Sequence, residues 1–223
     1  MRISDAGAEF AAAVNDWRGR IIHHSWVRRD QKLCWGNYAT SNLRIETYGD
    51  LRRAVRSQQY SVRFRDDSIA RMCYEYETGN TALKRASLSF HKMPEPIEGD
   101  EIWDAPEIGP WEDDLSANFD NDLWIRSLRF DYDPETGRGP PHAECHLHIG
   151  GYGGTRIATD GVPNYAQFLE FVMMCFFPKD YSAHRLAGGS TSPHVRVLDR
   201  LNACAFACDT TERRLPHLKI PTE

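Results

Sequence analysis

Two histidines separated by one residue, His146 and His148, are the side chains of this sequence best suited to chemistry. An imidazole, with an unperturbed pKa of about 6.5, can accept or donate a proton near neutral pH. Residues two apart on a β-strand point to the same face, so the two rings would lie side by side. The pair therefore suits general acid–base catalysis, in which one ring takes a proton and the other gives one.

Charged residues on a neighbouring strand would complete such a site. We expect the histidine strand to pair in a hairpin with the segment before it. Symmetric pairing about the turn places Arg129 opposite His146 and Asp131 opposite Glu144. Because side-chain direction alternates along a strand, these polar groups would share one face of the sheet.

The expected roles follow from the charges. Asp131 would orient a histidine, and His146 and His148 would be the acid–base pair. Positive side chains would contact phosphate and stabilise the charge that develops on its oxygens, and these are Arg129, Arg85 and Arg156. The combination suits metal-independent cleavage of RNA through the 2′-hydroxyl.

Two other interpretations of the histidines stay open. With Asp131 or Glu144 they could ligate a divalent metal. The nearby arginines would repel a cation, so we expect no metal and no cofactor. The histidines could also be structural, hydrogen-bonded within the sheet, in which case the protein would be a non-catalytic binding subunit.

Alternating polar and apolar residues predict the sheet that positions this site. The alternation runs along residues 69–77 and 82–91, on either side of a Gly79-Asn80 turn, and again along 123–133 and 143–149. Each hairpin then has one apolar and one polar face. The first hairpin would add to the polar face Arg71, Glu75, Arg85, Ser87 and Ser89.

Helices are expected to cover the apolar face. Residues 165–177 are apolar almost all round, and Asn164 with Gln167 resembles a capping box. Residues 5–19 have helical periodicity. The prediction is an α+β fold over 1–223 as a single domain, with an antiparallel sheet built from two hairpins and packed on one face by helices. Further elements are expected at 48–58 (a basic helix), 195–207 (a helix) and 217–220 (an edge strand).

Charge is unevenly distributed along the chain. Residues 93–122 form an acidic inserted segment with eleven Asp and Glu and no Lys or Arg, although the whole chain has a net charge of only −5. The rest of the chain has 27 basic against 21 acidic side chains, a net +6. That remainder could face a polyanion such as nucleic acid. The acidic segment would restrain the site or bind a partner protein.

Cysteine usage and hydropathy indicate the compartment. The six cysteines include no CxxC pair, and the sequence begins without the basic start and apolar stretch of an export signal. No apolar run is long enough to span a membrane. We therefore expect reduced thiols in a cytoplasmic protein that does not contact the membrane.

Three stretches of the chain resemble an uncharacterised bacterial family, DUF2290. They lie within residues 67–94, 129–157 and 163–177, and include the sequence His146-Leu147-His148-Ile149-Gly150-Gly151. The resemblance covers about half of the chain, mainly residues 66–178. It implies no particular activity, because no motif in it is a recognised catalytic signature.

A shorter stretch is similar to the TumE-type bacterial toxins. The shared features are a basic turn at 137–139, the His-x-His-Ile-Gly-Gly strand and an apolar helix at 168–176. This chain differs in an insertion at 140–144 and in its much longer N-terminal part. The resemblance implies a toxin-like fold of the kind found in toxin–antitoxin or phage-defence operons.

Together these features predict a bacterial toxin-like or phage-defence effector. It would act on nucleic acid, RNA in preference to DNA, as a candidate ribonuclease that uses His-based acid–base catalysis. A protein partner encoded nearby is also expected. The alternative is a non-catalytic subunit of a defence or toxin–antitoxin complex that binds a partner protein or nucleic acid.

Overall fold

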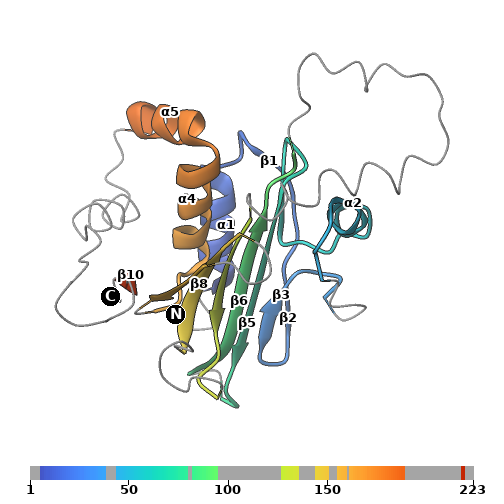
Figure 1. The fold of residues 1–223 in the computed structure, drawn as a ribbon, viewed down its shortest axis with the longest axis vertical. Helices are drawn as coiled ribbons and strands as arrows, with labels where there is room; N and C mark the ends of the chain where they lie inside the picture. The colour runs from blue at the N-terminus through green and yellow to red at the C-terminus, as the bar shows by residue number, and fades with distance from the viewer. Residues whose placement is uncertain are drawn as a thin grey trace.

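The computed structural model describes residues 6–38, 44–79, 82–94, 127–135, 144–150, 155–159, 161–188 and 217–218. A large sheet runs through these residues, with helices on either side of it (Figure 1). The helices are α1 (Ala6–Asp16), α2 (Tyr48–Arg56), α4 (Tyr165–Phe176) and α5 (Pro178–Gly188). The strands are β1 (Ile21–His24), β2 (Val27–Arg29), β3 (Lys32–Cys34), β4 (Val62–Phe64), β5 (Ile69–Tyr76), β6 (Leu83–His91), β7 (Ser127–Tyr132), β8 (Cys145–Ile149), β9 (Thr155–Thr159) and β10 (His217–Leu218).

The two predicted hairpins form the centre of the sheet. The strand order is β1-β4-β5-β6-β7-β8-β9-β10, and β2 and β3 form a short hairpin in which β3 also pairs with β5. Neighbouring strands are antiparallel except β9 and β10, which are parallel. The predicted α+β fold and its two hairpins are confirmed, but the sheet is larger than these four predicted strands, and helices pack on both of its faces (Figure 1).

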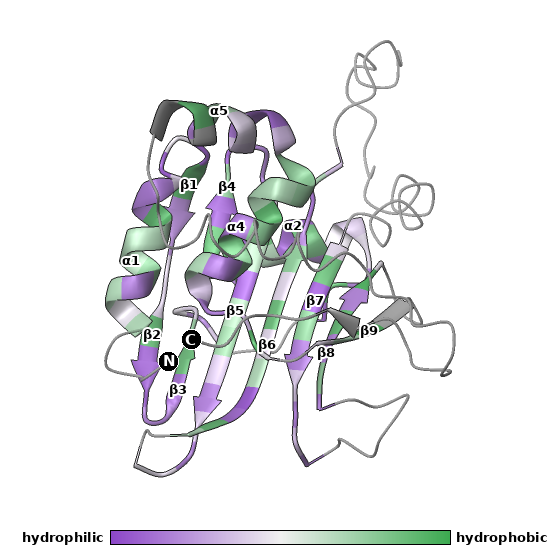
Figure 2. Ribbon diagram, turned by 90° about the vertical axis from the view of Figure 1, so that its left-hand side faces the viewer, coloured by the Kyte–Doolittle hydropathy of each residue, from purple (hydrophilic) through white to green (hydrophobic). Residues whose placement is uncertain are grey.

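Strand alternation separates the two faces of the sheet as predicted. Met72 lies opposite Leu88, which lies opposite Phe130, and Phe130 lies opposite Leu147. These four side chains are at most 2% exposed. Hydrophilic and hydrophobic residues alternate along the central strands in Figure 2. The residues between the apolar ones therefore build a continuous polar face.

Helices α1 and α4 cover the apolar face. Asn164 caps α4, with a reciprocal capping box to Gln167, so the helix begins where the sequence predicts. Phe168 of α4 is fully buried and its ring meets that of Phe130 edge to face, with centroids 6.1 Å apart. Phe10 of α1 packs in the same core. Burial of these large apolar side chains is the main stabilising term for the sheet.

The opposite face is covered at one end by α2. Thr47 caps this helix in a capping box with Asp50. Leu51 and Ala54 of α2 pack on Ile69 in a small second core, which also contains Tyr60. Figure 1 accordingly shows α2 on the other side of the sheet from α1 and α4. The part of the polar face on β7 and β8 is not under this helix.

Several local predictions differ from the structure. The second hairpin pairs two residues away from the symmetric register, so Arg129 lies opposite His148 and Asp131 opposite His146. A shift of two keeps every side chain on its predicted face. Pro178 was expected only to end a helix, but it also begins α5, where a proline needs no amide donor.

Other predictions fall wholly or partly outside the described residues. These are the acidic inserted segment after Pro94, the hairpin residues 123–126 and the helix expected at 195–207. The expected edge strand is described at His217–Leu218, where it forms β10. Among the described helices, none combines the length and the apolar composition that crossing a bilayer requires.

Candidate functional site

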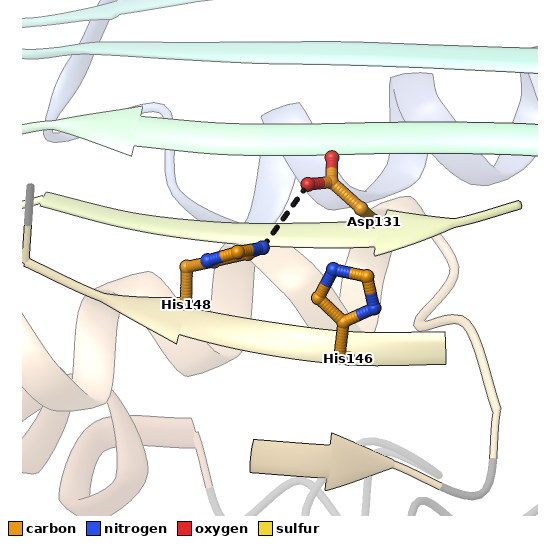
Figure 3. Close-up of side chains that lie close together, drawn as sticks. All are labelled: Asp131, His146 and His148. Atoms are coloured by element: carbon orange, nitrogen blue, oxygen red, sulfur yellow. Dashed lines mark ion pairs between the residues drawn. The ribbon is translucent and has the colours of Figure 1, made fainter. Parts of the chain in front are cut away.

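The candidate site lies on the polar face, where β7 and β8 pair. Asp131 stands on β7 directly opposite His146, and His148 lies opposite Arg129. On the other side of β7, Ser87 of β6 lies opposite Asp131. The sheet register therefore gathers all three residues predicted to be catalytic and one predicted arginine within two neighbouring strands, and Figure 3 shows Asp131, His146 and His148.

The side chains are in close contact. The ring centroids of His146 and His148 are 4.7 Å apart. Asp131 Oδ2 lies 3.4 Å from His148 Nε2 and 2.6 Å from Arg129 Nε. The Ser87 hydroxyl donates to Asp131 Oδ1 over 3.0 Å. Both carboxylate oxygens of Asp131 thus have partners, which fixes the orientation of the group.

Asp131 is held in its charged form. Its burial would by itself raise its pKa, but the hydrogen bond with His148, the positive charge of Arg129 and the hydrogen bond from Ser87 outweigh that effect. The pKa of Asp131 therefore lies below its ordinary value. The carboxylate is available as a fixed negative charge beside His148 at neutral pH.

His148 has a suitable neighbour in each of its protonation states. The ring is only 8% exposed. When Nε2 carries a proton it can donate to Asp131, and when Nε2 is unprotonated it can accept from Arg129 Nη2, 3.3 Å away. His148 Nε2 therefore has a partner in place both as a hydrogen-bond donor and as an acceptor.

The same residues could also offer ligands to a metal ion. Asp131, His146 and His148 each present one ligand atom, and these atoms lie within 4.8 Å of one another. Two imidazoles and a carboxylate are ligands that zinc accepts. Arg129, however, contacts the carboxylate oxygen and His148 Nε2, so a cation there would lie against a guanidinium. The guanidinium therefore disfavours a cation at this position.

The three arginines predicted to contact phosphate are placed differently. Arg129 is part of the cluster and its side chain is 46% exposed. Arg85 forms ion pairs with Asp133, at 3.3 Å, and with Glu135, at 2.5 Å, so two carboxylates already compensate its charge. The backbone of Arg156 lies opposite His148, while its side chain is outside the described part of the structure.

A half-buried histidine on the polar face was missed by sequence reasoning. His91 of β6 lies opposite Ile69 and Ser127, and its Nε2 is 3.2 Å from Ser89 Oγ. Burial first, and then the charges of Arg71 and Arg129, lower the pKa of His91 to about 3. The period-two pattern on β6 placed His91 on this face, but nothing in the sequence indicates its burial.

Arg71 is a buried polar residue of this face. It is 8% exposed, and its guanidinium lies 4.5 Å from the ring centroid of Trp35. Burial lowers the pKa of Arg71 to about 10, so it stays charged at neutral pH. In the sheet register Ser89 lies between Arg71 and Arg129. Positive charge therefore continues from the cluster across β6 to β5.

The fold and the site define an α+β protein with a histidine–aspartate–arginine cluster on the polar face of its sheet. The chain belongs to the DUF2290 family of uncharacterized conserved proteins, whose family model matches residues 22–220. Searches of curated proteins and of solved structures found no match. The comparisons thus leave the similarity to TumE-type toxins as a hypothesis.

Proposed function

We propose that this protein is a bacterial toxin-like or phage-defence effector that cleaves RNA by acid–base catalysis at His146 and His148. The proposal rests mainly on one observation, the position of His148 Nε2 between a carboxylate that can accept a hydrogen bond from it and a guanidinium that can donate one to it. We place this activity in the cytoplasm, with a protein partner encoded nearby.

The proposed reaction needs a base, an acid and a positive group. His146, which is half-buried, takes the proton of the ribose 2′-hydroxyl, and the oxygen attacks the adjacent phosphorus. Protonated His148 gives its proton to the departing 5′-oxygen, and Asp131 stabilises the ring before that transfer. Arg129 stabilises the negative charge on the phosphoryl oxygens. The products are a 2′,3′-cyclic phosphate and a free 5′-hydroxyl.

The test is cleavage of single-stranded RNA by the full-length protein and its variants. His146→Ala and His148→Ala should each lower the rate by at least about 100-fold, since positioned acid–base groups contribute on that order. His184→Ala is the matched control. This exposed histidine lies in helix α5, outside the strands β7 and β8 that carry the cluster (Figure 1). RNA with a 2′-deoxy residue at the cleaved position should resist cleavage.

Two results separate this proposal from its alternatives. Activity that survives a chelator supports acid–base catalysis, whereas activity that a chelator stops and zinc restores would assign the cluster to a metal. For a non-catalytic subunit with structural histidines, the wild type should show no cleavage, and the His148→Ala variant should lose several degrees of melting temperature. The burial of His148 is the observation that favours this second function.

A further inference from the structure

Two cysteines meet across the strands β3 and β5, on the same face as the histidine cluster. Lys32 pairs with Glu75 and Leu33 with Tyr74 in the register of this antiparallel pair. One further step brings Cys34 opposite Cys73. Lys32 and Glu75 form an ion pair of 3.1 Å on this face, and Cys34 and Cys73 point the same way because they lie two residues from them.

We propose that Cys34 and Cys73 form a reversible disulfide when a peroxide oxidises the protein. Residues directly opposite in an antiparallel pair have Cα atoms about 4.5–5.5 Å apart, within the range of about 4.4–6.8 Å that disulfides span. The two thiols are hydrogen-bonded to each other. This spacing allows a disulfide between the two positions without a large shift of the strands.

The surroundings make the two thiols unequal. The hydrogen bond with Cys73 lowers the pKa of Cys34 against the opposing effect of burial, and the charges of Arg29 and Lys32 add to the lowering. The same hydrogen bond, with burial, raises the pKa of Cys73. The lowered pKa makes Cys34 the better nucleophile of the two, although Cys34 is buried and Cys73 is half-buried. Cys73 is then the thiol that resolves the oxidised form of Cys34.

The reaction balances with one peroxide molecule. The Cys34 thiolate attacks a peroxide oxygen, the O–O bond breaks, and Cys34 sulfenic acid and hydroxide result. The Cys73 thiol then attacks the Cys34 sulfur and displaces hydroxide, and the proton released forms water with it. Overall, two thiols and hydrogen peroxide give a disulfide and two waters, and a dithiol reverses the change.

The disulfide would join a short edge hairpin to the central sheet. Strand β3 has three residues, and two of them pair with β5 in the register given above. Trp35 and Tyr38 follow β3 directly, and Trp35 packs on Arg71. Oxidation would therefore fix the segment that covers the Arg71 end of the polar face. This inference is independent of RNA cleavage.

The experiment treats reduced full-length protein with hydrogen peroxide, blocks free thiols by alkylation and digests the protein without reductant. Mass spectrometry should find one cross-linked pair of peptides that joins Cys34 to Cys73, and dithiothreitol should remove it. Cys73→Ser should abolish the pair. Cys175→Ser, which changes an exposed cysteine of α4, should keep it.

Stability provides a second measurement on the same samples. The oxidised wild type should melt about 5–15 °C higher than the reduced protein, and oxidised Cys73→Ser should show no such rise. Circular dichroism checks that Cys73→Ser folds. The proposal is overturned if Cys34 and Cys73 are recovered as separate alkylated or over-oxidised peptides, or joined to other cysteines, when Cys175 is already oxidised.

Discussion

At the scale of single residues, the polar face keeps charged groups partly or fully out of water. Asp131 shares its oxygens among Ser87, Arg129 and His148, and its lowered pKa shows that these contacts outweigh the cost of burial. On the same face, His91 is neutral at neutral pH because its burial, and then the charges of Arg71 and Arg129, lower its pKa. The same positive charges that would attract a phosphate therefore set the protonation of their neighbours.

The pKa of His91 leads to a prediction about pH and stability. The folded-state pKa is about 3 and the unfolded value about 6.5, so between these values the unfolded chain binds more protons. The free energy of unfolding must therefore fall as pH drops from about 6.5 toward 3. The contribution of His91 to this loss at pH 5 is about 2 kcal/mol.

His91→Gln isolates this contribution, because glutamine does not titrate. Urea unfolding at pH 7 and pH 5 should show that the variant loses about 2 kcal/mol less than the wild type over this interval. All other titrating groups are common to both proteins and cancel in the comparison. Equal losses in the two proteins would show that His91 takes up its proton in the folded state as readily as in the unfolded chain.

At the scale of elements, helix α4 ties the site to the core. Phe168 and Phe171 of this helix both contact Phe130, whose neighbours on β7 are Arg129 and Asp131. Phe168 is fully buried, whereas Phe171 is only partly buried. The apolar side of β7 is therefore held by the helix while its polar side carries the cluster.

Truncation of these two phenylalanines should have unequal effects. Phe168→Ala should lower the free energy of unfolding by about 3–5 kcal/mol, because it leaves a cavity in a dry core. Phe171→Ala, the matched control, should cost clearly less, because its site is partly open to solvent. Denaturant unfolding measures both values, and equal costs would contradict the burial difference between the two rings.

The elements also show how far the sequence predicts the structure. Long alternating segments around Met72 and Leu88 span several periods, so they indicate both the strand and the buried face. Strands β2 and β3 have only three residues each, too few to establish a period. The two-residue register error arose because side-chain alternation fixes the face and leaves shifts of two equally acceptable.

For the candidate site, the sequence likewise predicts which residues share a face of the sheet but not which side chains contact one another. His146, His148, Asp131 and Arg129 share a face because of their parity in the sequence, and no exact register is needed for that. The ion pairs that occupy Arg85 depend on side-chain positions near a turn, which a pattern does not encode. The meeting of Cys34 with Cys73 depends on a contact between distant segments, and no local signal marks it.

At the scale of the whole molecule, charge separates along the chain. The acidic inserted segment, residues 93–122, carries eleven of the 32 acidic side chains, and the remainder has a net charge of +6. An RNA that approaches Arg129 would meet attraction from the remainder and repulsion from this segment. Both effects act through charges in solvent, so both must weaken as salt rises.

Neutralising the acidic inserted segment tests this competition without shortening the chain. A full-length variant with the eleven acids replaced by Asn or Gln should bind single-stranded RNA at least about tenfold more tightly at about 50 mM salt. The gain should shrink toward zero at high salt, because screening removes the repulsion that the substitutions relieve. Fluorescence anisotropy over a salt series measures both quantities.

Neutralising the exposed Asp16 and Glu77 instead removes two negative charges outside the segment, and per charge removed it should raise the affinity less than neutralising the segment does. Equal affinity of the neutralised variant and the wild type at every salt concentration would mean that the segment does not compete with RNA. The segment's charge would then have to act on a separate basic partner, and that partner's affinity should fall in the neutralised variant.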